Sequence, residues 1–167
     1  MDAIRNRVQE SGIVTIDPVD FYVEGERVVF DFSEHLFQGL ILKEKEFREF
    51  IKNNDWSKYT GKLVAIDCSV DALIPYWAYM LVAVSLKPYA GYFISGNLND
   101  LEKSLFQQKL SEMKTEEYAD KKIMIKGCGE KPVPVFVYTE LVNKLKPVVS
   151  SIMYGEPCSA VPVYKRG

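Results

Sequence analysis

Residues 63–96 decide the fold class, because the stretch LVAIDCSVDALIPYWAYMLVAVSLKPYAGYFISG contains a strand, a helix and a second strand in succession. The apolar run at its start and the β-rich run at its end are typical of strands, and the apolar segment between them is typical of a core helix. The chain continues the alternation. The predicted elements are strands at residues 63–67, 92–95, 122–126 and 151–154 and helices at 74–87, 98–114 and 135–146. Such alternation implies right-handed crossovers, so we expect residues 59–154 to form a mainly parallel sheet in an α/β fold.

An internal repeat supports this interpretation. When the chain is shifted by 59 positions, Pro75 falls on Pro134, Tyr79 on Tyr138 and Gly96 on Gly155, and Leu86-Lys87-Pro88 falls on residues 145–147. Proline suits the first turn of a helix, whereas lysine followed by proline suits its end. Glycine after a strand suits a turn with positive φ. The pattern indicates a duplicated βαβ unit, with two unrelated but similar units as the alternative.

The N-terminal third predicts a different arrangement. We expect a strand at residues 13–16, a hairpin whose arms are residues 21–23 and 28–32, and a helix from Ser33 to about residue 53, with Gly39 as a candidate interruption of the helix. Since no linker rich in Gly, Ser or Pro interrupts the chain, we expect a single domain over residues 1–167. Its expected parts are an N-terminal extension (1–56), a first βαβ unit (57–97), a connecting helix (98–115) and a second βαβ unit with the tail (116–167).

Composition excludes several classes of protein. The hydrophobic fraction of 47% and the charged fraction of 26% are ordinary for a globular chain, and the net charge of −2 argues against a nucleic-acid partner. The charged N-terminus has no apolar core of a signal peptide, and the most apolar run, residues 72–86, is too short for a membrane span and contains Pro75. Three cysteines cannot complete a disulfide framework, so we expect reduced thiols in a bacterial cytoplasm.

The three cysteines are the principal candidate site. Cys68, Cys128 and Cys158 each follow a predicted strand, and ligands bind open α/β sheets at the carboxyl ends of strands. Thiolates hold zinc, iron and iron–sulfur clusters, so we expect these cysteines to bind one of these cofactors. No CxxC pair is present. Possible additional ligands are Asp71, Glu130, Glu156, the single histidine His35, or water.

A second candidate site surrounds Cys128. Gly127 and Gly129 flank this cysteine, and Lys131 follows before a predicted helix start. Glycines and a lysine at a helix start can bind an anion through backbone N–H groups and the helix dipole. The third glycine of a dinucleotide-binding loop is missing, so a tight strand-to-helix turn is the alternative explanation of the glycines.

Several strings resemble a known family. They are Glu24-Gly25-Glu26-Arg27-Val28, the heptapeptide GLILKEK at residues 39–45, Lys126-Gly127-Cys128-Gly129 with the PVP tripeptide at 132–134, and SIMYGEPC at residues 151–158. On these strings the chain resembles, over its whole length, the bacterial family called domain of unknown function 2480. The resemblance implies that the gene lies beside iron–sulfur assembly genes. The resemblance therefore implies a cytosolic role near cluster biogenesis, with assembly proteins as partners, and transfers no catalytic residues.

Three functions remain open from the sequence. The leading hypothesis is a thiolate site of Cys68, Cys128 and Cys158 that binds zinc, iron or an iron–sulfur cluster in cluster assembly or maintenance. The alternative is a non-catalytic interaction module whose cysteines are packing residues. A third is an enzyme with a thiolate nucleophile at a helix start. The oligomeric state stays open.

Overall fold

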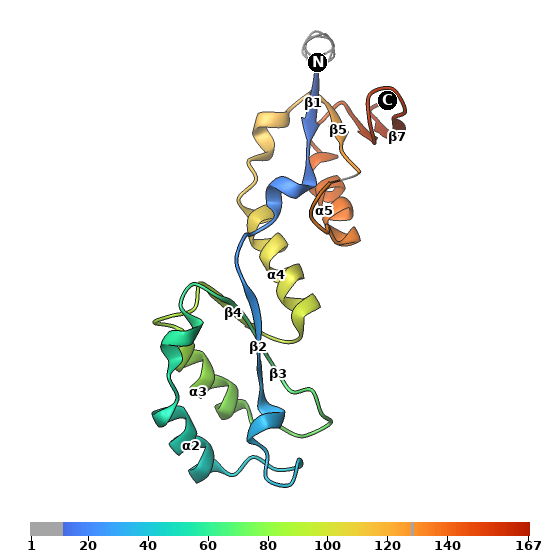
Figure 1. Ribbon diagram of the computed structural model, residues 1–167. Coiled ribbons are helices and arrows are strands. Elements are labelled where there is room, and N and C mark those ends of the chain that lie inside the picture. Colours follow the sequence, from blue (N-terminus) through green and yellow to red (C-terminus); the bar gives the residue numbers. More distant parts are fainter. Residues whose placement is uncertain (1–11, 128) are drawn as a thin grey trace. The chain divides into compact units, whose positions relative to one another are not determined.

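The computed structural model describes residues 12–127 and 129–167 (Figure 1). The α/β class and the mainly parallel pairing of strands are confirmed. The strands form two sheets, however, and the chain divides into two compact units. Unit 1 comprises Met1–Val23 and Leu105–Gly167, and unit 2 comprises Glu24–Ser104. Unit 2 is therefore an insertion between two segments of unit 1.

Unit 2 contains a parallel three-stranded sheet in the order β2-β3-β4. Its elements are β2 (Arg27–Asp31), the 3-10 helix η2 (Phe32–His35), α2 (Glu44–Asn53), η3 (Trp56–Tyr59), β3 (Leu63–Asp67), α3 (Tyr76–Leu86) and β4 (Tyr92–Ser95). Helices α2 and α3 pack together against the sheet (Figure 1). Aromatic and aliphatic side chains fill this core, among them Phe30, Phe32, Phe47 and Val82. Burial of this apolar surface is the main stabilising contribution to the unit.

Unit 1 contains a four-stranded sheet in the order β1-β5-β6-β7. Its elements are β1 (Ile13–Ile16), η1 (Pro18–Phe21), η4 (Thr115–Tyr118), β5 (Lys122–Ile125), α5 (Val135–Leu145), β6 (Ser151–Tyr154) and β7 (Val161–Lys165). Only β7 pairs antiparallel to its neighbour among these described strands. Helix α4 (Leu98–Ser111) begins in unit 2 and ends in unit 1.

The repeat in the sequence corresponds to a repeat in the structure. Helices α3 and α5, strands β4 and β6, and the turns η3 and η4 each begin and end at positions 59 residues apart. Hydrogen bonds repeat as well, since the N–H of Gly96 donates to Ile66 and the N–H of Gly155 donates to Ile125, both at 2.9 Å. Each of these glycines has a positive φ. Both units therefore contain the same βαβ arrangement.

A shorter repeat, shifted by 14 residues, extends the correspondence to the first strand of each unit. Strand β1 is followed by Asp17 and strand β2 ends at Asp31, and each aspartate caps the following 3-10 helix. Asp17 accepts from the N–H of Val19 at 3.1 Å, and Asp31 accepts from the N–H of Ser33 at 2.9 Å. Each first strand then pairs in parallel with the second strand of its own unit.

The predicted N-terminal hairpin is wrong. Pro18–Phe21 is a 3-10 helix, and β2 pairs in parallel with β3 instead of folding back on the preceding residues. Residues 21–26 carry the chain from unit 1 into unit 2. The predicted helix from Ser33 is also shorter than expected. Gln38 and Gly39 have positive φ, which a right-handed helix does not accommodate, so α2 begins only at Glu44.

Within residues 12–127 and 129–167, no helix has both the length and the apolar character that a membrane crossing requires.

Candidate functional site

Cys68 lies directly after β3, as the sequence predicts. Its thiol donates to the carbonyl of Val70 at 3.3 Å, and its N–H donates to Asp67 at 2.8 Å. The side chain is half-buried at the edge of the unit 2 core. Asp71, a predicted additional ligand, is exposed in the same loop. Here Cys68 contributes to packing and to the turn.

Cys158 lies in unit 1, exposed in the turn between β6 and β7, near the exposed Glu156. Cys128 lies outside the described residues. Its neighbours Gly127 and Gly129 follow β5, and Glu130 is exposed beside them. Strands β5 and β6 are adjacent and parallel, so the connections that carry Cys128 and Cys158 leave the same edge of one sheet.

The part of the chain that the structure describes contains no grouping of three or more His, Cys, Asp or Glu side chains that could hold a metal. Cys68 belongs to unit 2 and Cys158 to unit 1. The site of three cysteines therefore stays a prediction. His35 is not arranged as a ligand, because its ring stacks on Phe30 and lies 3.9 Å from the ring of Phe50, centroid to centroid.

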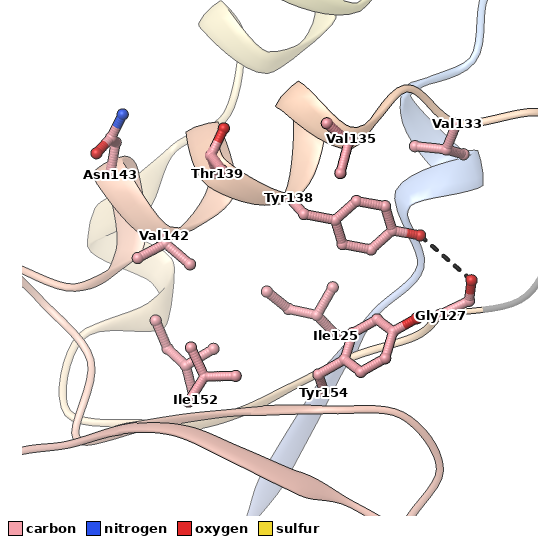
Figure 2. A pocket seen from close by; sticks show the side chains of 11 residues that line it. Ile125, Gly127, Val133, Val135, Tyr138, Thr139, Val142, Asn143, Ile152 and Tyr154 are labelled. Carbon is pink, nitrogen blue, oxygen red and sulfur yellow. Dashed lines mark hydrogen bonds between the residues drawn. The ribbon is translucent and has the colours of Figure 1, made fainter.

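A cavity of unit 1 with a volume of about 700 Å³ lies beside α5 at the carboxyl ends of β5 and β6 (Figure 2). Its lining is mainly apolar. The lining residues are Ile125, Gly127, Val133, Val135, Tyr138, Thr139, Val142, Asn143, Ile152, Tyr154 and Val163. Ligand pockets of about 300–1,000 Å³ commonly have this character, with a few polar groups that orient the ligand.

Two tyrosines meet at Gly127, at one end of this cavity (Figure 2). The hydroxyl of Tyr138 donates to the carbonyl of Gly127 at 3.4 Å, and the two rings make an edge-to-face contact at 5.9 Å. A Cβ atom at position 127 would overlap the hydroxyl of Tyr154. Glycine is therefore required here for a close approach of backbone to side chain.

A smaller cavity of about 220 Å³ adjoins the first and shares Gly127, Val133 and Tyr138 with it. Its polar lining includes Asp17, Lys126 and Lys131. Lys126 and Asp17 form an ion pair at 3.8 Å, and the Nζ of Lys131 lies 5.0 Å from the centre of the Tyr22 ring. The predicted anion-binding residues Gly127, Gly129 and Lys131 all line this cavity.

Unit 2 has a cavity at the corresponding place, of about 550 Å³, with different chemistry. In its lining, Asp67 corresponds to Lys126 of the smaller unit 1 cavity, and Ser95 corresponds to Tyr154 of the larger one. Beside it, Asp31 accepts from the N–H groups of Ser33 and Ser69 at 2.9 and 3.0 Å. Partial burial opposes ionisation of Asp31, but the hydrogen bonds from Ser69 and Ser33 outweigh it and lower the pKa to about 2. Lysine side chains therefore line the smaller cavity of unit 1, whereas the charged residue that lines the unit 2 cavity is Asp67.

Sequence reasoning identified only part of this site. It singled out Gly127, Gly129 and Lys131, but not Tyr154, Lys126 or Asp17, which lie at the carboxyl ends of three different strands. The sequence repeat contained a signal for Tyr138, because a shift of 59 positions places Tyr138 on Tyr79 and so marks both tyrosines as candidate site residues. In unit 2, burial raises the pKa of Tyr79, with smaller contributions from Cys68 and Asp67, so this tyrosine also lies beside the loop after the second strand.

Comparison with known proteins places the chain in a family. Neither the curated proteins nor the solved structures give a match. A family model, described as "Protein of unknown function (DUF2480)", matches residues 2–166. This range covers nearly the whole chain, as the resemblance implied. The protein belongs to the DUF2480 family.

Proposed function

We propose that unit 1 binds a small ligand with an apolar body and an anionic end. The observation that carries the proposal is the contact between two cavities of opposite character, one mainly apolar and one lined by Lys126 and Lys131. A ligand that crosses Gly127 and Tyr138 would place its apolar part against α5 and its charge beside the lysines. Medium-chain carboxylates have this chemistry.

Both parts of such a ligand, the apolar body and the anionic end, would contribute to the free energy of binding. Burial of apolar ligand surface supplies about 25 cal/mol per Å². The lysines add a charge-assisted interaction that fixes the orientation of the ligand. Tyr138 supplies a hydroxyl at the junction, and Thr139 and Asn143 add polar groups on the α5 side. No covalent step is required of any of these residues, so the proposed activity is binding.

Titration with decanoate, decanol and acetate tests this proposal, with binding followed by calorimetry and by backbone amide chemical shifts. We expect decanoate to bind more tightly than either of the others, because only decanoate fills both cavities. Lys131→Gln should weaken decanoate binding several-fold and leave decanol unaffected. Thr139→Trp should fill the apolar cavity and abolish binding of both.

Lys45→Trp is the matched control for the tryptophan variant, because Lys45 is exposed on α2 in unit 2. This variant should bind decanoate as the wild type does. Equal affinity for decanoate in the wild type and in Thr139→Trp would show that the cavity is not the site.

We also propose the thiolate site that the sequence predicts, for zinc, iron or an iron–sulfur cluster. It is supported by the strand order of unit 1, which sends the connections of Cys128 and Cys158 from the same edge of the sheet. Zinc and iron–sulfur clusters take thiolate ligands, so the donor chemistry fits either. The family resemblance supports a cytoplasmic role in iron–sulfur assembly, with assembly proteins as partners.

Elemental analysis of protein purified without oxygen tests the thiolate site. Bound metal should be lost in Cys128→Ser and in Cys158→Ser, because each removes one ligand of a shared ion. Cys68→Ser reports whether unit 2 contributes a third ligand. If wild-type protein purified without oxygen contains neither zinc nor iron, this second proposal is refuted. The proposal of a ligand with an apolar body and an anionic end would not be affected by this result.

A further inference from the structure

The outer edge of β4 is unpaired by any strand of the described chain, which distinguishes unit 2 from unit 1. At the corresponding edge of unit 1, β7 lies antiparallel to β6. The N–H groups of Tyr92 and Gly96 donate to Lys62 and Ile66 on the β3 side. Since successive residues of a strand direct their backbone groups to opposite sides, Phe93 and Ser95 direct theirs to the open edge. This edge can accept another strand.

The helix above this edge is apolar where its counterpart in unit 1 is partly polar. On α5, Val135, Thr139 and Asn143 line the cavity together with Val163 of β7. The corresponding residues of α3 are Tyr76, Met80 and Val84, which are 87%, 67% and 72% exposed. The correspondence between the units places this stripe above the space that a strand beside β4 would occupy. A helix that is apolar on every side is normally covered.

We propose that two copies of this chain associate through unit 2, with β4 of one copy antiparallel to β4 of the other. A two-fold axis perpendicular to the sheet gives this antiparallel direction and joins the two sheets into one. It also keeps both α3 helices on the same face, with their stripes of Tyr76, Met80 and Val84 opposed. This surface lies in unit 2, so the inference is independent of the ligand proposed for unit 1.

The spacing of the elements fits this assembly. Neighbouring strands lie about 4.8 Å apart, and a crossover helix lies over the gap between its two strands, so the two α3 axes would be about 9.6 Å apart. Packed helices have interaxial distances of about 8–10 Å. Pairing of the strands and packing of the helices are therefore satisfied together. A lone strand from another protein would cover the edge but leave most of the stripe exposed, so a second copy fits better.

The composition of the two edge strands agrees with this difference. Natural proteins protect free sheet edges with proline and lysine. The outermost strand of unit 1, β7, contains Pro162 and Lys165. Strand β4, with the sequence YFIS, contains neither and no charge. It therefore has the sequence of a strand that is covered in the assembled protein.

Light scattering and sedimentation of the full-length chain at several concentrations test the proposal. The wild type should have twice the mass of the 19.1 kDa chain. Ser95→Pro removes an outward N–H and leaves the bonds to β3 intact, and Met80→Lys places a charge in the stripe. Each should raise the dissociation constant of the dimer at least about tenfold, since a buried charge or a lost edge pairing costs more than about 1.4 kcal/mol.

Leu40→Lys is the matched control, because Leu40 is also apolar and 65% exposed in unit 2 but lies outside the stripe and the edge. This variant should remain a dimer, and far-ultraviolet circular dichroism should show that all three variants are folded. In a variant with the native cysteines changed to serine, Ile94→Cys should form a disulfide between copies, because residue 94 lies at the proposed axis. A monomeric wild type at all concentrations, or a dimer that Met80→Lys and Ser95→Pro both leave unchanged, would overturn the proposal.

Discussion

At the scale of single residues, the two units differ in side-chain size at one pair of corresponding positions. In unit 1, Gly127 faces the large Tyr154, and at the corresponding positions of unit 2, Cys68 and the small Ser95 stand instead. Gly127 does not belong to the glycines with positive φ, so its role is to leave space. Tyr154 is 41% exposed, so volume added at position 127 is accommodated by movement of the Tyr154 ring.

Gly127→Ala should therefore destabilise the protein by about 1 kcal/mol or less, because the added Cβ meets the end of a partly exposed side chain that can move. The added Cβ overlaps the Tyr154 hydroxyl and forces that ring to move. The double variant Gly127→Ala/Tyr154→Ser should recover most of this loss. Urea unfolding of the two single variants and the double variant gives the coupling energy. Additive effects of the two changes would contradict the contact.

His35 is the single histidine and lies among the aromatic rings of unit 2. Burial lowers the pKa of His35 below its ordinary value, an effect that the carboxylates of Glu34 and Asp31 partly oppose. The unfolded chain therefore binds the proton more readily than the folded one, and stability should be full above pH about 6.5 and decline as the pH falls below it.

Urea unfolding at pH 7.5 and pH 5.5 measures this decline in the free energy of unfolding. His35→Phe keeps a ring in the cluster but cannot be protonated, so its decline over the same interval should be smaller. An equal decline in wild type and variant would assign the effect to other groups.

At the scale of elements, a capped 3-10 turn follows the first strand of each unit. In unit 2 the cap is Asp31, which holds the N–H groups of Ser33 and Ser69 and so joins the turn to the loop after β3. Asp31→Ala should cost about 1 kcal/mol at pH 7, the typical loss of a capping side chain. Asp31→Asn keeps the accepting oxygen and should cost less.

The same aspartate contributes a dependence on acid. Because the pKa of Asp31 is lowered to about 2 in the folded state, its stabilisation is present above its ordinary pKa and is lost as the pH falls towards 2. Thermal unfolding measured between pH 5 and pH 2 should show that the difference in melting temperature between the wild type and Asp31→Asn decreases as the pH falls. A difference in melting temperature that stays constant from pH 5 to pH 2 would show that the charge of Asp31 does not stabilise the fold.

The elements that sequence reasoning predicted well have local signals. Proline before α3 and α5, and lysine with proline after them, place both helices within about two residues. The pairings of β1 and β2 were missed because they join residues far apart in the chain, and the repeat that marks them is only an aspartate after an apolar run. The antiparallel β7 was missed because Pro162 weakens its strand pattern.

At the scale of the whole molecule, unit 2 interrupts unit 1. The candidate site of unit 1 uses residues from both sides of this interruption, since Asp17 and Val19 precede unit 2 and Lys126 follows it. Sequence reasoning treated the first 56 residues as an extension and therefore had no reason to place Asp17 at the site. The glycines and Lys131 could be predicted because they lie next to each other in one loop.

The interruption predicts which parts fold alone. A fragment of residues 24–111 contains all of unit 2 and should unfold cooperatively on heating. A fragment of residues 105–167 lacks β1 and η1 and should not unfold cooperatively. Joining residues 1–23 to residues 105–167 through a Gly-Ser linker should restore cooperative unfolding. Circular dichroism during heating distinguishes these outcomes. Cooperative unfolding of residues 105–167 alone would show that β1 is dispensable.

The insertion also sets an order of events during synthesis. Strand β1 contains residues 13–16 and its partner β5 contains residues 122–125, so the partner is made only after the 105 residues 17–121. At about 5–20 residues per second, the ribosome takes roughly 5–20 s to translate the intervening stretch. Unit 2 is completely synthesised within this interval and can fold while β1 is still without its partner strand β5. The newborn chain thus exposes a short apolar strand for seconds, and this is the period in which a chaperone that holds extended segments would be most useful to it.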